Sequence, residues 1–258
     1  MSIKNVLAAV GVAVVGVTGA KVSTMDVFAT TVHSINEQET LTQTITTQDT
    51  AIVQLTPKFE DEKYTYKSYG TGVFISDNVI LTAAHVLRDD KATFSHIEFR
   101  HNGETYYAYP QDVTLYNESY KSSDADDMAI IRVRLVDKHT NLKLSEETEK
   151  TKVHIIGYPA DKDEKPDLNV GRPYESHGET IKQLHGLWYT TAYTLPGMSG
   201  APLLNETNEI IGLHVGKATT EDMIDRKKKF STSIRLDSKK IEWLQKQIKE
   251  NASWTSPR

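Results

Sequence analysis

The chain has no cysteine among its 258 residues. This absence excludes disulfides, thiolate nucleophiles, cysteine-ligated zinc and iron–sulfur clusters. The chain also has little net charge: it contains 30 Lys and Arg and 35 Asp and Glu, which gives a formal charge of −5. Nucleic-acid-binding domains are typically basic, so we expect no nucleic-acid partner. With 14 Gly, 8 Pro and 38% hydrophobic residues, the composition excludes collagen-like and strongly disordered chains and indicates a globular protein.

Long hydrophobic runs are scarce, and the main one lies at the N-terminus. Residues 5–20 carry no charge and follow Lys4, but the run is shorter than the about 20 residues that a membrane-spanning helix needs. A basic start, an apolar middle and a small-x-small exit are the layout of a secretory signal peptide. Such an exit is present at 18–20 and at 27–29, and the second is preferred because 21–29 then form the polar region before cleavage. We therefore expect a signal peptide over residues 1–29 and a secreted chain without membrane contact. A single-pass anchor is the alternative. A secreted chain without cysteine is typical of Gram-positive bacteria.

Beyond this run the sequence favours β-structure. Residues 30–50 are rich in Thr and Gln, and indicate a linker, a pro-segment or a surface arm. From about 51 to 236, short segments rich in Val, Ile, Tyr and Thr alternate with Gly, Asn, Asp or Pro, as in an all-β barrel or sandwich. One amphipathic helix is expected at 237–251, capped by Asp237 or Ser238.

The strongest local motif is Gly197-Met198-Ser199-Gly200, which precedes an apolar, strand-like segment. Glycines on either side of a serine allow a tight turn that exposes the hydroxyl and directs backbone N–H groups to one point, as an oxyanion hole requires. Because a strand-like segment follows, the motif differs from the serine elbow that precedes a helix in α/β-hydrolases. Taken alone, the motif also fits a plain hairpin turn.

Two further motifs precede this serine. His85 ends Thr-Ala-Ala-His after a β-like run, and Asp127 opens Asp-Met-Ala-Ile-Ile, an acid entering an apolar strand. A carboxylate there is expected to be partly buried and to need a partner. Each motif alone also fits an ordinary packed histidine or a turn at a strand start, and Asp126 is an adjacent alternative to Asp127.

Taken together, the motifs follow the order His, Asp, Ser. Residues 82–85, 127–131 and 197–202 resemble the histidine, aspartate and nucleophile motifs of chymotrypsin-like serine peptidases. Gly157-Tyr158-Pro159, Glu175-Ser176-x-Gly178 and Ile211-Gly212-Leu213-His214 narrow the resemblance to the staphylococcal-type glutamyl endopeptidases. The matching stretches run from about Gly70 to Gly216.

The resemblance implies a role for each site residue. Ser199 is the nucleophile, His85 the general base and acid, and Asp127 the residue that orients the imidazole. The N–H groups of Gly197 and Ser199 form the oxyanion hole. The primary specificity pocket contains Thr194, His214 and Gly216, which implies cleavage after Glu and less well after Asp. The alternative for His214 is that it only fills a pocket wall.

The resemblance also implies the architecture: all-β, with two antiparallel six-stranded β-barrels and a C-terminal α-helix. The first barrel spans about 50–135, the second about 150–236 and the helix 237–251. The family's usual interval before His85 places the mature N-terminus near Ile35, so that a pro-segment of 30–34 is removed and residues 35–258 form the peptidase domain. We expect a monomer with protein or peptide substrates.

Some features depart from the resemblance or compete with it. No cofactor or metal is expected, since no His-Glu-x-x-His motif is present. Met198 stands where digestive members of the family have an aspartate that pairs with the new N-terminus, so the nucleophile loop must be held in another way. The competing hypothesis is an inactive or highly restricted, toxin-like secreted protein with the peptidase fold, although all three catalytic residue types are present.

Overall fold

The protein is described from a computed structural model. The expected signal peptide, residues 1–29, and the expected mature terminus at Ile35 lie outside the described residues, and only the backbone is described for the first two short segments. The structure describes residues 30–32, 41–43, 51–101, 103–134, 140–160, 171–217 and 230–252.

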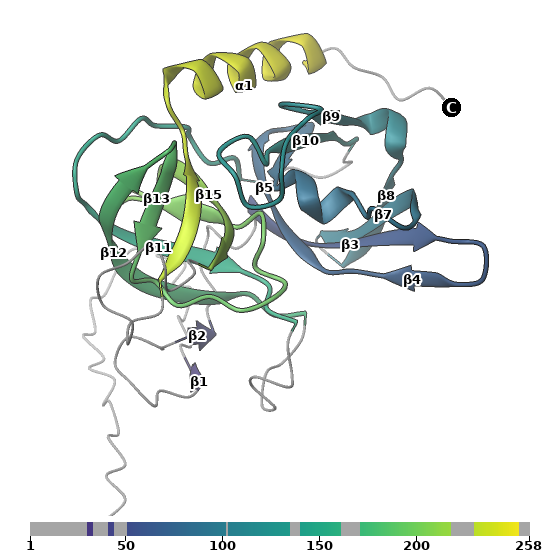
Figure 1. Ribbon diagram of the computed structural model, residues 1–258, viewed down its shortest axis with the longest axis horizontal. Coiled ribbons are helices and arrows are strands. Elements are labelled where there is room, and N and C mark those ends of the chain that lie inside the picture. The colour runs from purple at the N-terminus through teal and green to yellow at the C-terminus, as the bar shows by residue number, and fades with distance from the viewer. Residues whose placement is uncertain are drawn as a thin grey trace, which may run out of the picture.

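The first half of the described chain forms an antiparallel sheet (Figure 1). Its strand order is β8-β7-β3-β5-β6-β10-β9, and β4 pairs with β3. The strands are β3 (Ile52–Glu60), β4 (Thr65–Lys67), β5 (Gly70–Ser76), β6 (Val79–Thr82), β7 (Thr93–His101), β8 (Glu104–Ala108), β9 (Val113–Leu115) and β10 (Ala129–Arg132).

The second half forms a closed barrel. Its order β12-β11-β14-β15-β16-β13 closes because β13 also pairs with β12. Two N-terminal strands, β1 (Thr30–Val32) and β2 (Leu41–Gln43), extend the sheet, since β2 pairs with β12. The barrel strands are β11 (Lys152–Gly157), β12 (Tyr174–Leu184), β13 (Leu187–Thr190), β14 (Pro202–Leu204), β15 (Ile210–Lys217) and β16 (Ser231–Arg235).

These two sheets confirm the expected fold class, all-β with two barrel-like sheets. The first sheet differs in detail from six strands, because the β3–β4 and β7–β8 hairpins extend it. Strands β5 and β6 are buried along almost their whole length, as expected for apolar strands covered on both faces. One apolar core fills the first sheet and continues into the second through Leu204, Ile210 and Leu213. A second core inside the closed barrel contains Trp188, Tyr174 and Met198.

The only α-helix of the described residues is α1 (Ser238–Asn251), which confirms the expected C-terminal helix. Asp237 is its N-cap, because its carboxylate accepts a hydrogen bond from the Lys240 N–H at 3.0 Å. The helix follows the second barrel and returns over the first (Figure 1), where Leu244 is fully buried and Trp243 packs edge-on against Tyr116. Among the described residues, no helix is both long and apolar enough to cross a membrane.

Candidate active site

The structure brings His85 and Asp127 into direct contact. His85 lies in the short 3-10 helix η2 (Ala84–Leu87), which follows β6, and Asp127 immediately precedes β10. The imidazole Nδ1 lies 2.6 Å from Asp127 Oδ2, and the His85 backbone N–H donates to Oδ1 at 2.8 Å. Asp127 is fully buried, whereas 24% of the His85 side chain remains exposed. The imidazole is thus oriented by a buried carboxylate and keeps one edge accessible.

Asp127 receives a third hydrogen bond that the sequence does not reveal. The backbone N–H of Ser123 donates to Oδ2 at 2.6 Å. Three donors satisfy this buried carboxylate, which would otherwise be costly to desolvate. Asp126, by contrast, is half-buried and accepts a hydrogen bond from the Asn117 side chain at 2.8 Å. Of the two candidate acids, it is Asp127 that contacts His85.

The nucleophile loop depends on two glycines with positive φ, Gly197 at 94° and Gly200 at 85°. A Cβ at Gly197 would lie 2.6 Å from the Tyr158 carbonyl oxygen. A Cβ at Gly200 would overlap Thr82 and the backbone of Thr71. The loop therefore packs with its backbone directly against the end of β6, the strand that precedes His85. Ser199, between these glycines, is half-buried.

The peptide groups around Ser199 are held in a defined orientation. The Pro196 carbonyl accepts a hydrogen bond from the Ala160 N–H at 2.9 Å, and the Met198 carbonyl accepts one at 3.0 Å from the N–H three residues later. The described peptide bonds are trans, so each N–H points away from the carbonyl of its own peptide. The N–H groups of Gly197 and Ser199 donate to no described carbonyl. Both are available to bind an oxyanion.

Thr71 of β5 fixes this loop, a role that no local motif indicates. Its N–H donates to the Ser199 carbonyl at 2.8 Å, and its hydroxyl donates to the Gly197 carbonyl at 3.0 Å. The same hydroxyl accepts a hydrogen bond from the Tyr158 N–H at 3.0 Å. Met198 points into the second core and is fully buried. The loop is thus held by a buried threonine and a buried methionine instead of an ion pair.

The structure shows no direct bond between the serine and the histidine. Within the described part of the chain, no hydrogen bond joins the Ser199 hydroxyl to His85. Catalytic hydrogen bonds are often long before substrate binds and tighten in the complex. The structure therefore contains a formed His85–Asp127 pair and a Ser199 hydroxyl that does not yet make a hydrogen bond to His85.

Two expected pocket residues, Thr194 and His214, are both buried, at 2% and 3% exposure. The Thr194 hydroxyl and Nδ1 of His214 are buried polar atoms with no hydrogen-bond partner among the described residues. The other ring nitrogen of His214 bonds to the backbone of Thr232. Burial, and secondarily the neighbouring His85, lowers the pKa of His214 to about 3. His214 therefore carries a neutral imidazole whose Nδ1 lone pair has no partner among the described residues.

The strand that carries His214 also approaches the Asp127 loop. The β15–β16 pairing shifts register between His214 and Gly216, a β-bulge of the kind found beside active sites. A Cβ at Gly216 would lie 2.9 Å from the Ser123 hydroxyl oxygen, and that hydroxyl donates to the Val215 carbonyl at 2.9 Å. Gly216 is thus placed by close backbone approach, and Ser123 connects the aspartate loop to the pocket strand.

Lys217 is a cation near Thr194 and His214 that the sequence analysis does not single out, because it follows the motif that ends at His214. The Lys217 ammonium lies 5.9 Å from the centre of the Tyr193 ring. It is close enough to His214 to contribute to the lowered pKa of that imidazole. Since Tyr193 adjoins Thr194 in the chain, a positive charge is available near the two expected pocket residues.

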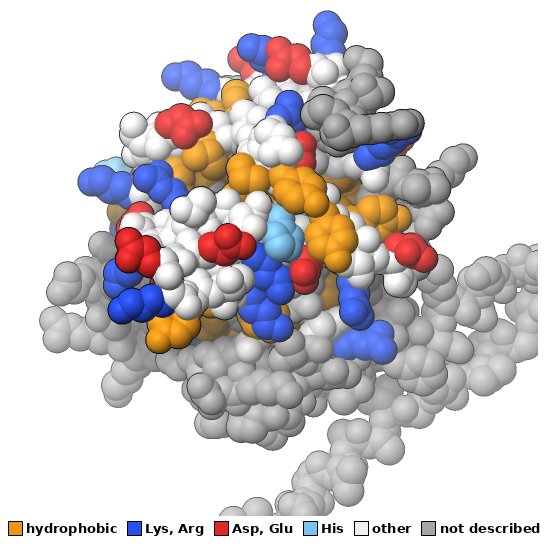
Figure 2. Space-filling model, turned by 90° about the vertical axis from the view of Figure 1, so that its right-hand side faces the viewer, with side chains coloured by type: hydrophobic (Ala, Val, Ile, Leu, Met, Phe, Trp, Pro, Cys, Tyr) orange, Lys and Arg blue, Asp and Glu red, His pale blue; other side chains and the backbone are white. Residues whose placement is uncertain are grey.

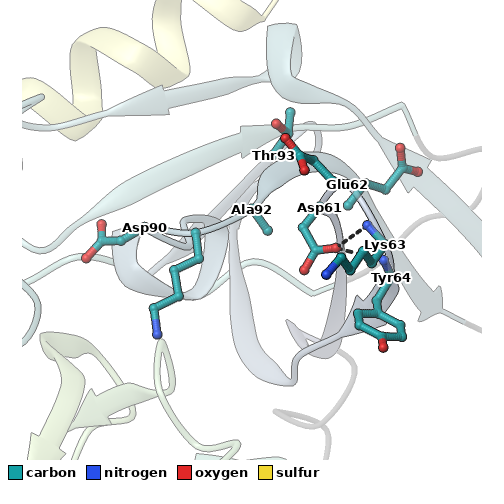
Figure 3. A pocket seen from close by; sticks show the side chains of 9 residues that line it. Asp61, Glu62, Lys63, Tyr64, Asp90, Ala92 and Thr93 are labelled. Atoms are coloured by element: carbon teal, nitrogen blue, oxygen red, sulfur yellow. Dashed lines mark hydrogen bonds between the residues drawn. The ribbon is translucent and has the colours of Figure 1, made fainter.

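Other surface features lie away from these residues. A pocket of about 890 Å³ lies between the β3–β4 turn and the loop before β7, and Figure 3 shows the side chains that line it. There the Asp61 carboxylate accepts hydrogen bonds from the N–H groups of Lys63 and Tyr64, each at 2.7 Å. Figure 2 shows the outer side of the first sheet, where hydrophobic side chains gather around a histidine. None of the expected site residues lines the cavity.

Comparison with known proteins agrees with this geometry. Residues 70–213 match the family described as trypsin-like peptidase domain. Exfoliative toxin A of Staphylococcus aureus is 27% identical over 189 residues, which is 62% of this chain and 64% of the toxin. A glutamyl endopeptidase of Staphylococcus epidermidis is 26% identical over 164 residues, which is 57% of this chain and 54% of that protein. The chain thus spans less than two thirds of the length of these curated relatives.

Solved structures show the same fold. A Glu endopeptidase structure has a TM-score of 0.60 at 18% identity, covering 83% of this chain and 99% of that one. A protease of M. tuberculosis in its active form has a TM-score of 0.55 at 17% identity, covering 82% and 84%. The family match covers most of both sheets, including the His85–Asp127 pair and the Ser199 loop, and the chain belongs to the trypsin-like peptidase family.

Proposed function

We propose that the protein is a serine endopeptidase that hydrolyses peptide bonds through an acyl-enzyme. The observation that carries this proposal is the 2.6 Å contact between His85 Nδ1 and the buried Asp127, beside a serine loop with two available N–H groups. A carboxylate bound to Nδ1 fixes the tautomer in which Nε2 accepts a proton. Ser199 is the nucleophile, because its hydroxyl belongs to the same loop as the two N–H groups, of Gly197 and of Ser199 itself, that would bind the oxyanion.

The proposed reaction has two steps. Ser199 Oγ attacks the peptide carbonyl while His85 Nε2 takes its proton, and the same proton passes to the leaving amine when the C–N bond breaks. Water then attacks the acyl carbon while His85 Nε2 takes its proton. The ester bond between this carbon and Ser199 Oγ breaks, Oγ receives the proton back from His85, and the carboxylic acid leaves. Asp127 stabilises the imidazolium in both steps. The N–H groups of Gly197 and Ser199 stabilise the tetrahedral oxyanion, an effect of about 3 kcal/mol per donor.

We further propose that the enzyme prefers Glu, and less strongly Asp, before the scissile bond. Support comes from Thr194 and His214, whose buried polar atoms have no partner among the described residues and so lack the hydrogen bonds that buried groups normally make. A carboxylate would accept one bond from the threonine hydroxyl and one from Nδ1, once that nitrogen carries a proton. Lys217 supplies additional positive charge beside the pocket.

Export is part of the same proposal. A charge-free run after Lys4, with a small-x-small exit at 27–29, favours removal of residues 1–29 and a secreted, monomeric enzyme. The further removal of residues 30–34 would give a mature chain that begins at Ile35. N-terminal sequencing of active enzyme tests this point, and activity with Thr30 still present as the first residue would contradict it.

A fluorophosphonate probe tests the catalytic proposal. We expect stoichiometric labelling of Ser199, measured by intact mass and peptide mapping, and no labelling of the Ser199→Ala variant. Absence of labelling in the wild-type protein would refute the enzyme assignment. A peptide-library profile then tests specificity. Preference for Glu, lost in His214→Leu, is expected, whereas a preference for aromatic or basic residues would overturn the pocket assignment.

The second candidate is a highly restricted, toxin-like peptidase. The observation that favours it is the similarity to a protein named exfoliative toxin A. The absence of a hydrogen bond between Ser199 and His85 among the described residues is compatible with both candidates. In this case alignment of the serine would require contacts with a specific protein. Slow fluorophosphonate labelling, combined with no cleavage of any short glutamyl peptide, would favour the restricted enzyme over a general endopeptidase.

A further inference from the structure

A group of three possible metal ligands lies on the outer face of the second barrel, apart from the proposed catalytic residues. It consists of His154 on β11 and of Glu175 and His177 on β12, whose ligand atoms all lie within 4.8 Å of one another. His177 Nε2 is 3.2 Å from Glu175 Oε1, and His154 Nε2 is 3.9 Å from the same oxygen. Two imidazoles thus converge on one carboxylate.

The strand register explains this convergence. Strands β11 and β12 are antiparallel, and His154 lies directly opposite His177. Glu175 is two residues from His177 and therefore lies on the same face of β12. The alternate residues, including Ile155 and Ser176, are buried, whereas the three candidate ligands are not. The His154 and His177 rings stack with their centres 5.6 Å apart.

We propose that His154, Glu175 and His177 bind a divalent transition-metal ion of the zinc class. Two histidines and one carboxylate are a ligand set that zinc accepts in tetrahedral geometry, with water in the fourth position. With metal–ligand bonds of about 2.0–2.2 Å, neighbouring ligand atoms are about 3.3 Å apart. The His177–Glu175 distance already fits at 3.2 Å, and the His154–Glu175 distance of 3.9 Å requires only a small side-chain rotation.

The surroundings support ligation. The side chain of Asn208 hydrogen-bonds His154, which is the kind of outer contact that orients a metal-binding imidazole. His177, with 72% of its side chain exposed, leaves the site open to solvent.

The site also adjoins the proposed specificity pocket through one residue. Ser176 lies between Glu175 and His177, points to the other face of β12 and accepts a hydrogen bond from the Tyr193 N–H at 2.7 Å. Tyr193 directly precedes Thr194. An ion held by Glu175 and His177 would therefore fix the part of β12 that supports this pocket wall. The metal is a structural element in this proposal and takes no part in peptide hydrolysis.

Zinc chloride titration of the purified protein tests the proposal. We expect one bound zinc by calorimetry and by elemental analysis after dialysis, with a rise in Tm that depends on zinc concentration. His177→Ala should weaken zinc binding by at least about 100-fold, more than loss of an outer-shell contact usually does. This variant should fold, because His177 is largely exposed, and its Tm without zinc should match that of the wild type. Glu175→Gln should lose binding similarly.

His96→Ala is the matched control. His96 also lies on a strand face with its Nε2 near a carboxylate, 3.6 Å from Glu98 Oε1, but within the described part of the chain no second imidazole converges on that carboxylate to complete a three-ligand group. The control should bind zinc like the wild type. Absence of saturable binding in the wild type, or equal binding in His177→Ala, would overturn the proposal. Binding that persists in His177→Ala but disappears in His85→Ala would place the ion at the catalytic pair and overturn it as well.

Discussion

The His85–Asp127 pair and the expected pocket differ in how far their buried polar groups are hydrogen-bonded. In the first, the fully buried carboxylate of Asp127 receives three hydrogen bonds, two of them from His85. In the second, the buried polar atoms of Thr194 and His214 have no partner among the described residues. A satisfied group is fixed before substrate arrives, whereas an unsatisfied one gains its bonds only from a ligand.

This difference separates catalysis from recognition in physical terms. The His85–Asp127 pair is preorganised, so its contribution should be the same for every substrate. The pocket is incomplete, so its contribution should depend on the side chain that enters it. Thr71 and Ser123 connect the two halves, because each hydrogen-bonds across from the first sheet or its loops to the second barrel.

The largest expected effect on activity comes from Asp127, the buried carboxylate that is fully hydrogen-bonded. Asp127→Asn should lower kcat by about 10⁴-fold, because an amide no longer stabilises the imidazolium or selects its tautomer. The ratio of kcat/KM for Glu and Gln substrates should stay unchanged. Steady-state kinetics on both substrates measures this, with Asp126→Asn as the control that should retain activity. Loss of activity in Asp126→Asn alone would reverse the assignment of the two acids.

A smaller loss is expected where the first sheet holds the serine loop. Thr71→Val removes the hydroxyl that binds the Gly197 carbonyl and the Tyr158 N–H. Displacement of the oxyanion donors should lower kcat by about 10²-fold with little change in KM. Thr71→Ser keeps the hydroxyl and should restore most of the activity. If Thr71→Val raised KM instead, the threonine would belong to recognition rather than catalysis.

The sequence identifies the proposed catalytic residues better than the residues that support them. His85, Asp127 and Ser199 stand in short local motifs, so their candidacy is visible without a fold. Thr71 and Ser123 act through contacts with residues 126 and 92 positions away, which no local pattern encodes. The metal-ligand group is hidden for the same reason, since only the β11–β12 register places His154 opposite His177.

The elements of the fold are also predicted best where the signal lies in neighbouring residues of the sequence. Apolar runs predict β5, β6 and β10 well, because these strands are buried on both faces. No apolar run marks the eleven-residue strand β12, because this strand exposes alternate residues and its sequence is largely polar. The helix α1 was predicted with its cap, because the three-and-four spacing and the Asp237 signal are both local.

The unpaired Nδ1 of the buried His214 predicts that the preference for Glu over Gln depends on pH. Burial lowers the pKa of His214 to about 3 in the free enzyme, and a bound Glu carboxylate should raise it. At a pH between the pKa of His214 in the free enzyme and its higher pKa in the complex, the complex holds one more proton than the free enzyme. Affinity for a Glu substrate therefore falls as pH rises. The Glu/Gln ratio of kcat/KM should therefore fall by up to about tenfold per pH unit, while titration of His85 affects both substrates alike. In His214→Gln the ratio should not vary with pH; a flat ratio in the wild type would contradict proton uptake.

The smallest effect is expected at Ser123, where the two halves meet. Ser123→Ala removes the hydrogen bond to the Val215 carbonyl and keeps the N–H bond to Asp127. Loss of one neutral hydrogen bond, about 1 kcal/mol, corresponds to about a fivefold fall in kcat/KM. Because the bond aligns the aspartate loop with the pocket strand without touching the pocket's polar atoms, the fall should be equal for Glu and Gln substrates, and Ser122→Ala should have no effect. A selective loss for Glu substrates would instead assign Ser123 to substrate recognition. The loop that carries Asp127 would then contain residues of both kinds, one that orients His85 and one that contributes to the pocket.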